Sequence, residues 1–177
     1  MRKPLYPLFL FLILVVFSCS DAVKVEENKP RIFPDYDVAL DEIIRSNVGV
    51  IRGVDLNSKA SIITQSETKL PTEVGSDFLY FEYQVDTNTN YSVSYNLKND
   101  SLDEVEVQIN CKDLELCSKL FSQLKTFYEK KLPNPVEDKG YVVYNCFEGQ
   151  RKPFVVSLTD NSSPTQGMIN LVIYKDK

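Results

Sequence analysis

Regular alternation of apolar and polar residues between positions 79 and 111 constrains the fold of this 177-residue chain more than any other feature. The alternating segments are LYFEYQV (79–85), YSVSYNL (91–97) and VEVQINC (105–111). A period of two is typical of a β-strand with one buried and one solvated face. The intervening stretches DTNTN and KNDS favour turns. The region therefore predicts three antiparallel strands.

Helical periodicity follows these strands. Asp113 is placed to cap a long helix that Pro133 would end, and one apolar stripe along it contains Cys117, Leu120, Phe121, Leu124 and Tyr128. Shorter patterns predict one short helix after Asp35 or Asp37 and a second after Asp55. Three further apolar segments, YVVYNCF, PFVVSLT and MINLVIY, predict strands. We therefore expect an α+β domain: an antiparallel sheet of about six strands, with one long and one or two short helices packed on one face.

The N-terminal residues have a different character. Arg2 and Lys3 precede an uncharged run over 5–17, which is shorter than the roughly 20 apolar residues that span a membrane. A basic start followed by a short apolar run fits a secretory signal peptide. Val16-Phe17-Ser18-Cys19 resembles the lipobox of bacterial lipoproteins, in which a peptidase cuts before the cysteine. The resemblance implies a signal peptide over 1–18 and lipidation of Cys19; the alternative is cleavage after Ser20, which would leave a soluble exported protein.

The residues that follow are similar to lipoproteins of the Bacteroidetes group, because a serine and an acid come directly after the cysteine. This implies a protein of the bacterial cell envelope, anchored by lipid, with the outer membrane as the expected location and its periplasmic or surface face left open. Residues 20–35 mix charges with prolines and show no period, which is typical of a linker. We therefore expect a lipidated tether over 19–35 and a single domain over 36–177.

The charge of the chain restricts its partners. The formal net charge is −5, and cleavage before Cys19 would leave about −7, because Arg2 and Lys3 are lost with no acidic residue. An acidic domain disfavours nucleic acid and anionic membrane surfaces as partners. We expect a membrane contact through the lipid anchor and a protein partner.

The chain contains no histidine, the commonest general base and a common zinc ligand. We therefore expect no enzymatic activity, no metal and no cofactor. Glu104 and Glu106 share one side of a predicted strand, and Glu82 lies on the polar side of another. A carboxylate pair could perform acid–base chemistry, as in glycosidases. A solvated sheet face explains these residues more simply and predicts an acidic surface for a basic partner.

Three cysteines lie in the predicted domain. An exported chain can form a disulfide, and Cys111, Cys117 and Cys146 allow one bridge and one free thiol. If the long helix crosses back over the sheet and the next strand returns, all three cluster at one end of the sheet. The alternative is three small buried residues without a bond.

Asp100-Ser101-Leu102 resembles the O-glycosylation sequon of Bacteroidetes and falls in a predicted hairpin turn. Ser101 is therefore a candidate modification site.

The expected arrangement of helices against an antiparallel sheet is similar to two exported families. These are the small lipoproteins that assist outer-membrane assembly and the beta-lactamase-inhibitor-like domains. The segment IRGVDLNSKASIITQSE (51–67) loosely resembles the glycine-led helical segment of the first family. Two functions are compatible with these features: a membrane-anchored, non-enzymatic binding or scaffolding domain of the cell envelope, or an inhibitor or immunity-type protein that blocks an envelope-acting enzyme.

Overall fold

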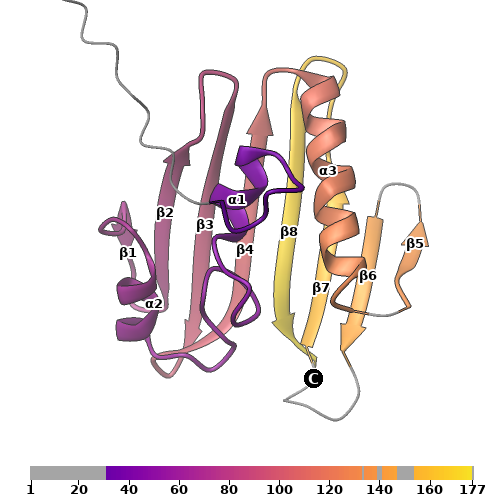
Figure 1. Cartoon of the computed structure of the whole chain (residues 1–177). Helices are drawn as coiled ribbons and strands as arrows, with labels where there is room; N and C mark the ends of the chain where they lie inside the picture. The colour runs from indigo at the N-terminus through magenta and orange to yellow at the C-terminus, as the bar shows by residue number, and fades with distance from the viewer. Residues whose placement is uncertain (1–30, 133, 139–140, 147–153, 177) are drawn as a thin grey trace, which may run out of the picture. The chain divides into compact units, whose positions relative to one another are not determined.

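One antiparallel sheet forms the framework of the domain and has the helices on one of its faces (Figure 1). The computed structural model describes residues 31–132, 134–138, 141–146 and 154–176, which belong to the unit Arg31–Lys177. Within these residues there are eight strands in the order β1-β2-β3-β4-β8-β7-β6-β5. They are β1 (Glu73–Val74), β2 (Phe78–Gln84), β3 (Thr89–Lys98), β4 (Ser101–Cys111), β5 (Val136–Asp138), β6 (Tyr141–Cys146), β7 (Phe154–Asp160) and β8 (Gly167–Lys175).

Three helices are present in the described part of the chain: α1 (Val38–Ile44), α2 (Ala60–Ser66) and α3 (Leu114–Glu129). Asp113 caps α3, because its carboxylate accepts a hydrogen bond of 2.8 Å from the backbone N–H of Glu115. Leu120 and Leu124 of α3 pack into the same buried cluster as Val107 of β4 and Leu171 of β8. Each such side chain contributes about 1.5–3 kcal/mol when it is fully buried, so this shared core fixes the helices to the sheet.

The expected α+β class with an antiparallel sheet is confirmed, but two details are wrong. The sheet has eight strands rather than about six, because β1 and β5 contain only two and three residues and are too short to show alternation. The helix predicted to be long is of ordinary length, with 16 residues, and ends at Glu129. The residues just before a proline are biased away from helical geometry, which is consistent with an end ahead of Pro133.

The folded unit begins earlier than residue 36. Phe33 is buried and its ring meets that of Phe127 edge to face, with the centroids 5.2 Å apart. Nearby, Arg31 Nε lies 2.9 Å from Asp41 Oδ2. Phe33 and Ile32 form only a short apolar pair between Arg31 and Pro34, so they produced no periodic signal in the sequence.

The direction of β6 differs from the expectation for the second half of the sheet. After α3 the chain forms β5, then turns back as β6 (Figure 1). Cys146 pairs with Phe154, which pairs in turn with Lys175 at the end of β8, whereas Cys111 pairs with Gly167 at the start of β8. The expected cluster of three cysteines is therefore wrong, because the unforeseen β5 reverses β6 and places Cys146 at the opposite end of the sheet from Cys111.

Candidate functional site

The first candidate site is a buried group of charges and tyrosines on the helix-covered side. It is positioned by a tight turn in which Ile51 and Val54 form an isolated antiparallel bridge. The two central residues, Arg52 and Gly53, have φ values of 52° and 82°, the pattern of a type I′ turn. A left-handed conformation costs a non-glycine residue roughly 1–2 kcal/mol, so the contacts of the Arg52 side chain must offset this.

Those contacts join Arg52 to Glu67, and both side chains are fully buried. Arg52 Nε donates to Glu67 Oε1 at 2.8 Å and Nη2 donates to Oε2 at 2.7 Å, a bidentate pair. Arg52 Nη1 donates to the carbonyl oxygens of Glu42 and Ile43 at 2.8 and 2.9 Å. We name the group of Arg45, Arg52, Glu67, Tyr83 and Tyr95 the buried ion cluster.

Glu67 is saturated with donors. Besides Arg52, it accepts hydrogen bonds from Arg45 Nη1 at 2.8 Å, from the hydroxyl of Tyr83 at 2.6 Å and from the hydroxyl of Tyr95. Burial by itself raises the pKa of Glu67, but the hydrogen bonds and charge of Arg52 outweigh burial, so the pKa is lower than its ordinary value. Both carboxylate oxygens are in use, which makes this cluster a structural element rather than a ligand site.

The second candidate site lies on the open face of the sheet, opposite the helices. There β2, β3 and β4 present polar side chains from every second residue: Tyr80, Glu82, Gln84, Asn90, Ser92, Ser94, Asn96, Glu104, Glu106, Gln108 and Asn110. The register places Ser92 opposite Glu82 on one side and Ser94 opposite Glu106 on the other. The middle strand therefore has small side chains, and larger ones flank it.

This difference in side-chain size produces a hollow of about 640 Å³ over β3. Its lining includes Ser92 and Ser94 of β3, Glu82 of β2, and Glu106 and Gln108 of β4. We name this hollow, with these five residues, the open-face groove.

The open-face carboxylates Glu82, Glu104 and Glu106 differ from Glu67 in their contacts. No ion pair within the described residues involves Glu82, Glu104 or Glu106. Their side-chain contacts are neutral: the Tyr80 hydroxyl donates to Glu82 at 3.3 Å, and Asn96 Nδ2 donates to Glu104 at 2.8 Å.

Lys69 also lines the hollow, yet its ammonium group lies 4.6 Å from the centroid of the Tyr83 ring and donates to the backbone carbonyl of Glu82. Lys69 therefore forms no ion pair with Glu82 or Glu106, and the two carboxylates and one lysine of the lining leave one negative charge in excess.

The other half of the open face is less polar. β7 and β8 present Val155, Val172 and Tyr174 there, together with Ser157 and Asn170. Val155 and Ser157 are buried, at 5% and 7% exposure. Glu82, Glu104 and Glu106 thus lie away from this less polar half, and the register places two further carboxylates, Glu73 of β1 and Asp138 of β5, on the same face at the edges of the sheet.

The predicted site residues separate into groups. Cys19 lies outside the described residues. Glu82, Glu104 and Glu106 come together on the open face, where alternation placed them. The sequence did not predict the pairing of Arg52 with Glu67 in the buried ion cluster, because two charges 15 positions apart produce no periodic pattern.

Ser101 and the cysteines are placed more precisely by the structure. Ser101 is half-buried as the first residue of β4, and the hairpin turn itself is formed by Asn99 and Asp100. Cys111 and Cys117 are buried free thiols beside one another.

The described residues offer neither a metal site nor a membrane-spanning helix. No group of three or more His, Cys, Asp or Glu side chains there could hold a metal ion. Within the same residues, no helix combines the length and the apolar character needed to cross a membrane.

Comparison with known proteins gave no match to a protein-family model, a curated protein or a solved structure. The function of this chain must therefore be inferred from its own residues.

Proposed function

We propose that the folded unit is a non-enzymatic binding module whose open-face groove holds a basic segment of a partner protein. The observation that carries this proposal is that Glu82 and Glu106 lie on two sides of a hollow and form no ion pair among the described residues, so that two carboxylates face one lysine, Lys69, in its lining. A hollow of about 640 Å³ lies within the range of sites that hold small ligands or side chains, roughly 300–1,000 Å³.

Electrostatics favours a lysine or arginine side chain as the group that enters the groove. Opposite charges 4 Å apart interact by about 1 kcal/mol in bulk water and by about 4 kcal/mol at the lower effective dielectric near a protein surface. Unpaired carboxylates on a folded surface also steer basic partners toward it before contact. The serine hydroxyls and the Gln108 amide can accept further hydrogen bonds from a guanidinium or ammonium group.

Non-enzymatic binding fits the residues available for chemistry. The chain has no histidine, and the buried carboxylate of Glu67 is held by Arg52 and cannot act as a free acid or base. Glu82 and Glu106 lie on strands separated by the serine-bearing β3, where contact with water explains them without an acid–base role.

A lipid anchor at Cys19 completes this proposal and would hold the module at a membrane of the bacterial envelope, most simply the outer membrane. Metabolic labelling with a fatty-acid analogue tests the anchor: the native chain should take up label and the Cys19→Ser variant should not. Label on the variant, or none on the native chain, would contradict the lipoprotein interpretation.

Selection from a random peptide library tests the groove. Peptides captured by the purified protein should be enriched in Lys and Arg, and capture should fall at least tenfold for the Glu82→Gln, Glu106→Gln double variant. A matched control removes the same charge from the exposed Glu42 of α1 and Glu115 of α3, and should bind like the native protein. Equal losses in both variants would show a general charge effect, and enrichment of acidic or apolar peptides would refute the proposal.

Crosslinking in intact cells identifies the partner. A photoreactive residue at Ser94 in the groove should capture a protein that the same residue at the exposed Ser118 of α3 does not. Capture of an envelope-acting lytic enzyme would favour the inhibitor or immunity-type role over a scaffolding role.

A further inference from the structure

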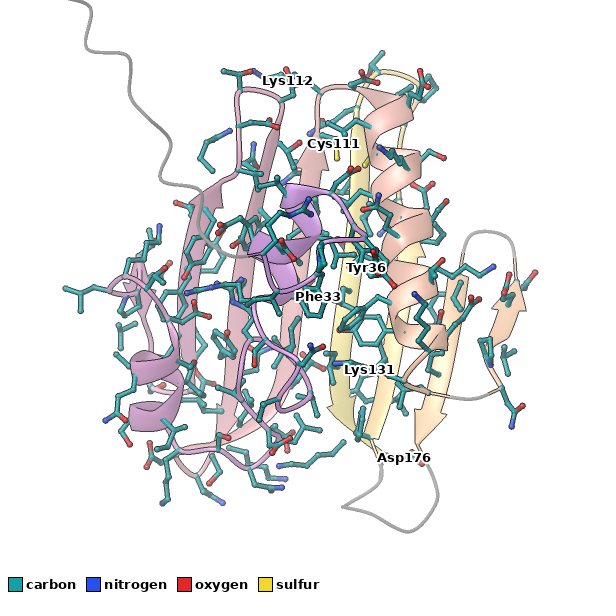
Figure 2. All side chains as sticks on the ribbon, in the orientation of Figure 1. Phe33, Tyr36, Cys111, Lys112, Lys131 and Asp176 are labelled. Atoms are coloured by element: carbon teal, nitrogen blue, oxygen red, sulfur yellow. The ribbon has the colours of Figure 1, made fainter. Side chains whose placement is uncertain are left out.

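Two buried thiols meet where the central strand β4 passes into α3. Cys111 is the last residue of β4 and Cys117 is the fourth residue of α3, and they are 1% and 2% exposed. Figure 2 labels Cys111 at the end of β4 that adjoins the start of α3. The cap formed by Asp113 fixes the first turn of α3 and therefore the position of Cys117 relative to the strand.

Gly167 on the neighbouring strand makes room for this arrangement. It is the partner of Cys111 in the β4–β8 register. A Cβ atom on Gly167 would lie 2.5 Å from Cys117 Cβ and 2.6 Å from Cys117 Sγ, so any larger residue would displace the Cys117 side chain. Cys117 thus occupies the space above the glycine, and the same Cβ position would lie 3.3 Å from the backbone oxygen of Cys111, so the Cys117 side chain lies against the end of β4 beside Cys111.

We propose that Cys111 and Cys117 are a redox pair that closes into an intrachain disulfide by exchange with a low-molecular-weight disulfide. The Cys117 thiolate attacks one sulfur of the small disulfide, forms a mixed disulfide and releases one small thiolate. The Cys111 thiol then gives up its proton and attacks Cys117 Sγ, which releases the second small thiol. Two protein thiols are oxidised and one small disulfide is reduced to two thiols, so atoms and electrons balance.

The surroundings assign the order of these steps. The interaction between the two thiols lowers the pKa of Cys117 and raises that of Cys111, and it outweighs burial at Cys117, whereas burial raises the pKa of Cys111 further. A thiolate in the first turn of a helix is also stabilised by the helix dipole. Cys117 is therefore the attacking residue and Cys111 the resolving residue.

The sheet register excludes the third cysteine from this bond. Cys146 pairs with Phe154 at the opposite end of the sheet, so bridging it to Cys111 or Cys117 would require the strands to separate. The pair would tie β4, which carries Glu104 and Glu106 on its other face, to the start of α3. This inference is independent of the proposed function.

Peptide mapping decides the connectivity. The purified full-length protein is equilibrated with glutathione buffers of increasing oxidised fraction, alkylated and digested with trypsin. Cleavage after Lys112 separates the two cysteines, so a bond leaves peptide 99–112 joined to peptide 113–119. We expect this joined pair to form in the native protein and in the Cys146→Ser variant, and to be absent in Cys117→Ser.

Burial of the thiols could slow exchange, so the same buffers are also applied during refolding from urea. If the cysteines remain free under both conditions, or if peptide 140–151, which contains Cys146, is the one that becomes joined, the proposal is wrong. The oxidised protein should also melt roughly 5 °C above the reduced protein, a difference that Cys117→Ser should abolish. An oxidised form that melts at or below the reduced form would show that closure strains the fold and would overturn the assignment.

Discussion

Glu67 and Glu106 are carboxylates on opposite sides of the sheet, and they differ in burial, in hydrogen-bond donors and in ion pairing. Glu67 lies on the helix-covered side and accepts hydrogen bonds from Arg45, Arg52 and two tyrosines. Glu106 lines the open-face groove and has no ion-pair partner among the described residues. The same ionised group is thus part of the architecture in one place and available for binding in the other.

The difference shows that burial decides whether a carboxylate needs partners within the fold. A buried carboxylate requires a complete set of donors, because removal of one partner leaves an uncompensated charge in a medium of low dielectric constant. A carboxylate in a hydrated groove loses little of its solvation and needs no partner for the fold. Predictions that separate the two sites therefore concern stability on the covered side and binding on the open side.

The largest expected effect is on the covered side. Glu67→Ala leaves the guanidinium of Arg52 buried without its counterion and should lower the free energy of unfolding by about 3–5 kcal/mol. Urea denaturation measures this loss. The double variant Arg52→Met, Glu67→Leu removes both charges and should be more stable than Glu67→Ala alone. A loss below about 0.5 kcal/mol for Glu67→Ala, typical of surface sites, would contradict the buried ion cluster.

A smaller effect should appear as a dependence of stability on pH. The pKa of Glu67 in the folded state is below its ordinary value of 4.5. Its stabilising contribution is therefore complete above about pH 4.5 and is lost as the pH falls through the folded-state pKa.

Urea midpoints measured from neutral pH downward should fall less steeply for Glu67→Gln than for the native protein below about pH 4.5. Parallel curves for the native protein and Glu67→Gln would show that Glu67 does not titrate abnormally.

Residues on the open side of the sheet were predictable from the sequence, whereas the ion pair on the helix-covered side was not. The alternation of apolar and polar residues predicted β2, β3 and β4, because each strand has one solvent-exposed and one buried face. The same pattern assigned Glu82, Glu104 and Glu106 to the solvent-exposed face. The pairing of Arg52 with Glu67 has no such signature, since it depends on a turn with positive φ and on the packing of α1 and α2.

Short elements explain the other differences. β5, with three residues, is too short to be recognised by period, yet it reverses β6 and moves Cys146 to the other end of the sheet. The proximity of Cys111 and Cys117 was foreseeable, because a strand that ends at one cysteine leads directly into a helix that carries the other. Topology is therefore less predictable than the local neighbourhood of residues close in sequence.

The smallest expected effect on stability accompanies a large change of charge. Replacing Glu82, Glu104 and Glu106 by lysine changes the net charge by +6 but removes no ion pair among the described residues. The main interaction lost is the hydrogen bond from Asn96 to Glu104 at 2.8 Å, on a half-exposed face, so unfolding should change by roughly 1 kcal/mol or less.

Two measurements on this triple variant test whether the open-face carboxylates contribute to stability. They are thermal melting and capture of Lys- and Arg-rich peptides. Peptide capture should disappear while the melting temperature stays within a few degrees of the native value. A fall as large as that caused by Glu67→Ala would mean that the open-face carboxylates also hold the fold together, and the distinction between the two sides of the sheet would not stand.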